Sequence, residues 1–286
     1  MRWIADKVVG PVPRSGDEES LEEPHPFVPS RSAWIVAAVV SLIGVFHIVT
    51  TRSGHVWGDD FAMYIQHAKN VALGRPFGAT GYVYCPLAAQ LGPRTYPPLC
   101  PLLLAPVYRY FGLHLFAMKL EGIFFFVAGL WAVYAILARR LPFAHVPAII
   151  CVFGLNPFLW HMKDVIGSES LFFFLCMLAV VLVDAAERET QAHWRAAVVL
   201  GLNIYLCYAT RTVGIVLVPA LLIYTAVNGG KRSRFAALAA AGCLIFGCTA
   251  VPVIPRDWLI SRPVSCENGN YWCDLLQFTG VLLGAS

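Results

Sequence analysis

Two adjacent carboxylates, Asp59 and Asp60, lie in the stretch GHVWGDDFAMYIQHAKN, directly after an apolar run long enough to cross a membrane. Carboxylates at the edge of a bilayer repel each other and lose solvation, so they are retained most readily beside a cation, a metal ion or an acceptor hydroxyl. A carboxylate in that position can act as a general base toward a hydroxyl or an amine. The structural alternative is a helix cap, which accounts for Asp59 alone and does not explain both residues.

An amphipathic helix is predicted to begin at these aspartates. Apolar side chains recur after Asp59 at helical spacing, and polar side chains fill the other face. The apolar stripe comprises Phe61, Tyr64, Ile65, Ala68 and Val71, and the polar set comprises Gln66, His67, Lys69 and Asn70. We expect this helix to lie along a membrane surface, with Asp59 and Asp60 at its cap and first turn, where the helix dipole favours negative charge.

Two further charged residues, Glu169 and Arg211, stand at the ends of apolar runs. Glu169 follows Ser168 and heads an apolar helix, so a helix-start role and a role in a binding site are both open. Arg211 is the only charged residue between Ala196 and Gly230. An arginine in or beside a membrane is by default functional or ion-paired, and either a ligand phosphate or Glu169 would account for it.

The composition is that of a membrane protein. The 286 residues are 58% hydrophobic and 13% charged, with a mean hydropathy of +0.65, whereas about 25% of the residues of an average soluble domain are charged. The net charge of +4 comes from basic residues scattered among apolar segments. Because they form no basic patch interleaved with aromatic residues, nucleic-acid binding is not expected.

Seven apolar segments approach the roughly 20 residues that a helix needs to span hydrocarbon. We therefore predict an all-α polytopic protein with about seven transmembrane helices and its amino terminus inside. The predicted spans are residues 33–50, 122–138, 141–162, 170–183, 196–210, 212–230 and 235–255. Residues 1–31 are expected to form a disordered cytoplasmic tail, residues 32–255 the transmembrane module, and residues 256–286 a tail on the outer side that is truncated if a further span follows.

An eighth apolar stretch, TYPPLCPLLLAPVY (95–108), carries four prolines and is predicted to be a partly embedded part of a large outer loop spanning residues 51–116. With this assignment the short inner connections hold seven Arg or Lys residues and the short outer ones hold two, which agrees with the positive-inside rule. The connection 163–169 and the tail after Pro255 then also face outside. In that tail, Cys266 and Cys273 are a candidate disulfide if the compartment is oxidising.

The first outer loop carries a resemblance. WGDDFAMYIQHAKNVALGRPF followed by YPPLCPLLLAPVYRYFG is similar to the first outer loop of the GT-C membrane glycosyltransferases, in particular the bacterial branch similar to protein O-mannosyltransferases and aminoarabinose transferases. The positions that match the spacing in that family are Asp60, Tyr64, Ala68, Gly74, Pro97 and Pro98. Later segments, ARRL, GSESLFFFL and TRTVGIVLVPALL, also resemble the family, so that the likeness covers about residues 33–225.

The resemblance implies sugar transfer, with inversion, from a polyprenyl-phosphate carrier to a lipid, glycan or protein acceptor on the outer face of a bacterial plasma membrane. Asp60 would be the general base, with Asp59 as the alternative. The residues implied in donor-phosphate or substrate binding are Arg94, Arg211, Glu169, Tyr64 and Tyr96. Some relatives use a divalent cation such as Mg²⁺ or Mn²⁺, for which Asp59, Asp60 and Glu169 could supply oxygen ligands.

The chain departs from the family pattern in two places. The common Asp-Glu pair is replaced by Asp60 followed by Phe61, and the frequent Lys before the two prolines is Tyr96, so the role of that lysine is assigned to Arg94. Two rival interpretations remain. In one, the same charged residues line the path of a transporter or channel; in the other, the chain is a non-catalytic fragment. Arg75 and Arg109 in the same loop are expected to snorkel at the interface rather than bind a ligand.

Overall fold

The computed structural model describes residues 31–55, 57, 59–81, 96–188, 193–228, 236 and 238–244. For a few residues near helix ends, Asp59 and Asp60 among them, only the backbone is described. Several predictions concern residues outside this set: the tails before residue 31 and after residue 255, Arg94, the Cys266–Cys273 disulfide, and most of the seventh span.

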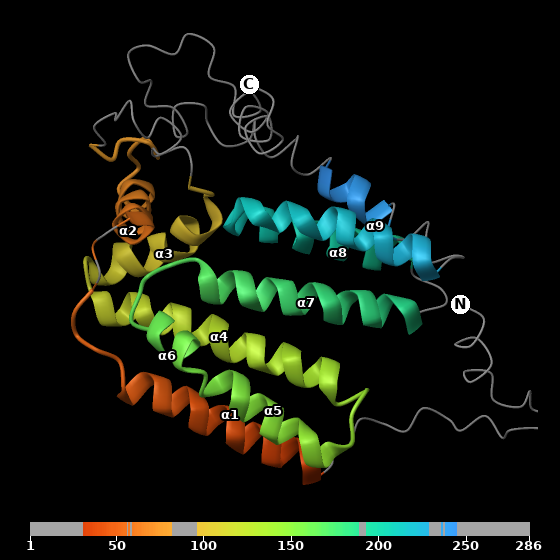
Figure 1. Ribbon diagram of the computed structural model, residues 1–286. Coiled ribbons are helices and arrows are strands. Elements are labelled where there is room, and N and C mark those ends of the chain that lie inside the picture. The colour runs from red at the N-terminus through yellow and green to blue at the C-terminus, as the bar shows by residue number, and fades with distance from the viewer. Residues whose placement is uncertain are drawn as a thin grey trace, which may run out of the picture.

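All regular structure in the described residues is helical, which confirms the all-α prediction. The long helices lie side by side, and α2 and α3 gather at one end of this bundle (Figure 1). The elements are α1 (Arg31–Val49), α2 (Asp59–Ala72), α3 (Leu99–Phe111), α4 (Leu115–Leu137), η4 (Phe143–His145), α5 (Val146–Gly154), α6 (Pro157–Met162), α7 (Glu169–Arg188), α8 (His193–Thr210), η5 (Thr212–Val216) and α9 (Leu217–Asn228).

The central contact of the bundle is between α4 and α7, with α1 and α5 packed on one side and α8 on the other. A side chain at Gly129 of α4 would lie 2.5 Å from the ring of Phe173 on α7, so glycine is needed for the two helices to approach this closely. The residues that α2 buries against α3, α4, α7 and α8 form one apolar cluster, which includes Tyr64, Ile65 and Ala68 of the predicted stripe. This cluster fixes α2 against the end of the bundle.

The third predicted span is not one helix. It divides into η4, α5 and α6, with the break at Leu155 and Asn156. A residue before proline disfavours helical backbone, and Asn156 has ψ 125° while Pro157 starts α6. The side chain of Asn156 accepts hydrogen bonds from Phe158 N and Leu159 N, which caps the new helix.

The proline-rich segment after Tyr96 is more regular than predicted. Residues 99–111 form α3, because Pro97 and Pro98 precede the helix and Pro101 lies in its first turn, where a backbone N–H is not required. Pro106 alone lies inside the helix. Residues 51–116 therefore contain helices, as expected, namely α2 and α3, while their place in an outer loop stays a prediction.

One helix among the described residues, Leu115–Leu137, is long and apolar enough by length and composition to cross a membrane, with a mean hydropathy of 2.0. Four shorter apolar helices, Ala33–Val49, Phe143–Gly154, Val198–Thr210 and Thr212–Val227, coincide with parts of the first, third, fifth and sixth predicted spans. The helical character of those segments is thus established, while the seven-span topology stays a prediction.

Candidate active site

The two aspartates lie at the start of α2, as predicted, with Asp59 as its first helical residue. The structure describes only the backbone of these two residues, so the aspartates are located by the backbone of α2. Asp60 comes one turn before Tyr64 along the helix, which puts the two positions on the same face. Tyr64 is 3% exposed, so that face is turned toward the rest of the protein.

Tyr64 connects α2 to the segment that precedes α7. Its hydroxyl lies 3.0 Å from the hydroxyl of Ser168, which is fully buried. The ring of Tyr96 packs against the Tyr64 ring in an edge-on arrangement, with centroids 5.7 Å apart. The two tyrosines that sequence reasoning assigned to substrate binding are therefore neighbours.

Glu169 and Arg211 form an ion pair beside this tyrosine. Arg211 Nη1 donates to Glu169 Oε1 at 2.5 Å and to Ser168 Oγ at 3.3 Å. Glu169 begins α7, where the helix dipole favours a carboxylate. Arg211 has extended backbone (φ −147°, ψ 132°) between α8 and η5, so it interrupts the helical run and brings its guanidinium to this end of the bundle.

The pair is neither buried nor fully exposed, since the side chains of Arg211 and Glu169 are 34% and 33% accessible. Solvent therefore reaches the pair. A guanidinium carries five N–H donors in a planar fork that suits a phosphate. Of the predicted site residues whose side chains are described, all four, Tyr64, Tyr96, Glu169 and Arg211, meet in one place.

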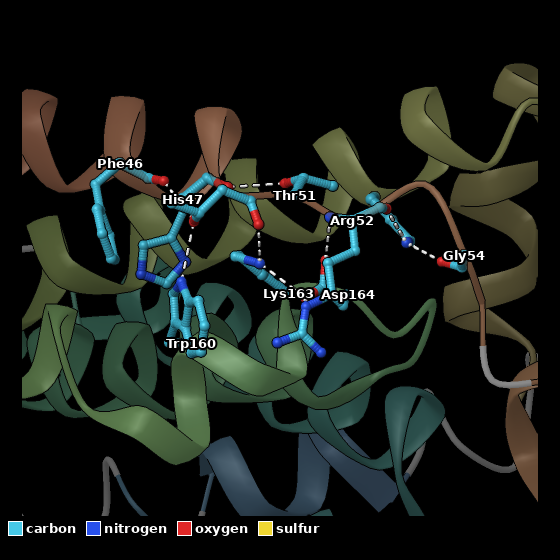
Figure 2. A network of polar contacts seen from close by, with 10 residues as sticks. Phe46, His47, Thr51, Arg52, Gly54, Trp160, Lys163 and Asp164 are labelled. Carbon is cyan, nitrogen blue, oxygen red and sulfur yellow. Dashed lines mark hydrogen bonds and ion pairs between the residues drawn. The ribbon is translucent and has the colours of Figure 1, made fainter.

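A second polar network, which we call the junction, lies where the chain leaves α1, and sequence reasoning missed it (Figure 2). Lys163 Nζ donates to Thr50 O and to Asp164 Oδ2, both at 2.8 Å. Asp164 Oδ1 accepts from Arg52 N at 2.7 Å. From α4, Lys119 Nζ donates to the carbonyls of Arg52 and Gly54. The junction ties residues 50–54 to α4 and to the connection before α7.

Electrostatics within the junction favour a charged Asp164. Burial by itself raises the pKa of this carboxyl, but the hydrogen bonds from Lys163 Nζ and Arg52 N, with the positive charges of Lys163 and Lys119, hold it below the ordinary value. Beside them, burial and the charge of Lys119 lower the pKa of His55. The signal that could have revealed the junction was Lys119 itself, a lysine within the apolar run LFAMKLEGIFFF.

The prediction that His67 and Asn70 lie on an exposed polar face of α2 is wrong. His67 and Asn70 are 0% and 1% exposed rather than facing outward. His67 Nδ1 lies 2.8 Å from Phe77 O, and Asn70 Nδ2 donates to Phe77 O and Ala79 O. They are buried because the turn after α2 folds back and its carbonyls need partners. Arg109 donates a hydrogen bond to Ala72 O, so its guanidinium binds the carboxyl end of α2.

Open space also borders α2. A cleft of about 340 Å³ runs along the helix and is bounded by aromatic, apolar and polar side chains. Its lining residues are Trp57, Ala62, Met63, Ile65, Gln66, Lys69, Thr80, Tyr108 and Leu113. Small-molecule sites typically have volumes of roughly 300–1,000 Å³.

No group of three or more His, Cys, Asp or Glu residues able to hold a metal ion occurs among the described side chains. Because Asp59 and Asp60 fall outside that set, their part in a cation site stays a prediction. A comparison of the chain with protein-family profiles, curated proteins and solved structures found no match.

Proposed function

We propose that this chain is a multi-pass membrane glycosyltransferase that moves a sugar from a polyprenyl-phosphate carrier to an acceptor on the outer face, as the sequence resemblance implies. The observation that carries the proposal is the meeting of Arg211, Glu169, Ser168 and Tyr64 next to the helix that Asp59 and Asp60 begin. These residues come from three separate parts of the chain. The partly exposed guanidinium of Arg211 can bind a phosphate oxygen, and a carboxylate at the start of α2 can take a proton from an acceptor.

In the proposed reaction, the acceptor hydroxyl or amine attacks the anomeric carbon from the face opposite the phosphate, which inverts that carbon. Asp60 takes the acceptor proton, and the bond between the anomeric carbon and the phosphate oxygen breaks. The polyprenyl phosphate leaves with the electron pair of that bond. Arg211, and Arg94 as the sequence suggests, would offset the charge that gathers on the leaving phosphate.

The proposal also names the residues that would bind a divalent cation. If Mg²⁺ or Mn²⁺ binds, the carboxylates of Asp59, Asp60 and Glu169 would be its protein ligands, since both ions prefer oxygen donors. Its contribution would be to neutralise phosphate charge, and the acceptor proton would still go to Asp60.

Several observations support the membrane topology. The helices expose many large apolar side chains, such as Trp34, Val49 and Phe124, which a lipid environment would cover. The parts predicted to face outside, namely α2, the connection 163–169 and Arg211, are joined by hydrogen bonds at one end of the bundle. Arg139 and Arg140, predicted to face inside, pair with Asp184 instead.

The test is transfer of radiolabelled sugar from a panel of polyprenyl-phosphate sugars, in membranes that contain the wild-type chain or Asp60→Asn, with EDTA or with added Mg²⁺ or Mn²⁺. Transfer by the wild type alone would support the proposal and identify the donor. No transfer by correctly inserted wild-type chain with any donor would count against it and favour a non-catalytic membrane protein.

A further inference from the structure

Lys119 is a buried cation that holds main-chain carbonyls. The residue is 1% exposed, and its Nζ lies 2.8 Å from Arg52 O and 2.5 Å from Gly54 O. Burying an ammonium group is costly unless hydrogen bonds compensate for the lost water. An apolar side chain at this position of α4 would avoid that cost. The two carbonyls are therefore the structural reason for a lysine here.

The segment that Lys119 holds leads directly to the start of α2. His55 follows Gly54, and its ring packs edge-on against the rings of Trp57 and Phe61, with centroids 5.0 and 6.4 Å away. Phe61 is the neighbour of Asp60. The contacts therefore run from the ammonium group through Gly54 and His55 to the first turn of α2.

Phe61 also lies close to the connection before α7, which carries Gly167. A Cβ atom built on Gly167 would lie 3.4 Å from Phe61 Cε1 and would clash with Glu169 Oε2. The Phe61 ring thus lies between His55 and the segment that carries Ser168 and Glu169. The position of the Phe61 ring therefore depends both on His55 and on the segment before α7.

The same junction supports the helix that Glu169 begins. Asp164 accepts from Arg52 N, and Lys163 Nζ donates to Thr50 O, so the connection before α7 is fastened to the segment that Lys119 holds. Asp59 comes five residues after Gly54 (59 − 54), and Glu169 comes five residues after Asp164 (169 − 164). The junction therefore holds the segments that precede both α2 and α7, the two helices that begin with acidic residues.

We propose that Lys119 is a positioning residue: its hydrogen bonds to the carbonyls of Arg52 and Gly54 set where α2 begins, and so set the place of Asp60 relative to the Arg211–Glu169 pair. The inference rests on the proposed function, because positioning has a catalytic consequence only if Asp60 acts on a substrate near that pair. A misplacement of about 1 Å between reacting groups can reduce a rate by about 10²-fold.

The kinetic test uses Lys119→Met, an unbranched side chain one atom shorter that lacks the donors, and Lys119→Gln, which keeps two N–H donors. The control is Arg139→Met, which removes a cation from the exposed ion pair with Asp184. Lys119→Met should lower kcat by about 10²-fold and change the donor KM by less than about threefold. Lys119→Gln should fall between Lys119→Met and wild type, and the control should match wild type. A raised KM with unchanged kcat would overturn the proposal.

A second measurement does not depend on turnover. Amide hydrogen exchange over residues 52–62 should accelerate at least tenfold in Lys119→Met, less in Lys119→Gln, and not in Arg139→Met. Wild-type exchange rates in folded Lys119→Met would overturn the proposal. If Lys119→Met does not fold, the same comparisons are made with Lys119→Gln. If wild type transfers no sugar, the proposed function fails, and hydrogen exchange alone decides whether Lys119 tethers the start of α2.

Discussion

The pairs Lys163–Asp164 and Arg211–Glu169 lie at the same end of the bundle and differ in what surrounds them. The side chains of Lys163 and Asp164 are 2% and 12% exposed, and both bond to the backbone of residues 50–52. Arg211 and Glu169 are each about one third exposed and bond to side chains. The first pair uses its hydrogen bonds to hold the chain itself, whereas the second is partly open to solvent. Burial and partner type thus separate the structural pair Lys163–Asp164 from the pair that we propose binds the donor phosphate.

Removing a member of the buried pair should have the largest effect on stability. Lys163→Met leaves Asp164 without its ammonium partner, and breaking a buried pair in this way typically costs about 3–5 kcal/mol. Arg139→Met, which removes one of two arginines from the exposed contact with Asp184, should cost less than about 1 kcal/mol. Thermal unfolding in detergent would compare them. Similar losses in both variants would contradict the distinction between the pairs.

Removing the exposed arginine should affect donor binding more than folding. If Arg211 binds the donor phosphate as we propose, Arg211→Ala deletes a charge-assisted hydrogen bond worth roughly 1.5–3 kcal/mol, and the donor KM should rise about 10- to 100-fold. Unfolding temperature should change less than in Lys163→Met. An unchanged dependence of the rate on donor concentration would exclude this role for Arg211.

A methyl group at Gly167 should disturb mainly the Arg211–Glu169 pair. Gly167→Ala puts a carbon atom where Glu169 Oε2 lies, so the carboxylate must move and its hydrogen bond with Arg211 must change. We expect a rate reduction of about 5- to 50-fold, from a smaller displacement than a lost tether would cause. The control is Gly122→Ala, where no atom lies within 4 Å of the added carbon. Equal rates in the two variants would show that the Glu169 position is unimportant.

The smallest effect concerns pH. Because the pKa of Asp164 is lowered in the folded protein, its pairing stabilises the fold above the ordinary value of 3.8 and loses this effect as pH falls through the folded pKa. Stability should therefore drop below about pH 4, and Asp164→Asn should remove part of that drop. The measurement is unfolding temperature between pH 3 and pH 7. An identical acid profile in Asp164→Asn would contradict the assignment.

Sequence reasoning located most helices, because apolar runs and the stripe beginning at Phe61 follow helical spacing. It also anticipated Glu169 as one of two partners for Arg211. The Asn156–Pro157 break was missed although its signal was present in the sequence. For the junction, Lys119 within an apolar run signalled a buried polar site, but its partners could not be predicted, because Lys119 and Lys163 bond to carbonyls 65–113 residues away and no local pattern encodes that pairing. His67 and Asn70 were misassigned because their partners are carbonyls of a turn.

In the reaction that we propose, the start of α2 supplies the base for sugar transfer. The most direct test compares Asp60→Asn with Asp59→Asn, using the donor that the wild type accepts. Loss of a true general base should lower the rate by about 10²- to 10⁴-fold, so Asp60→Asn should be nearly inactive and normally inserted, with Asp59→Asn less impaired. Equal activity in both variants would contradict the account.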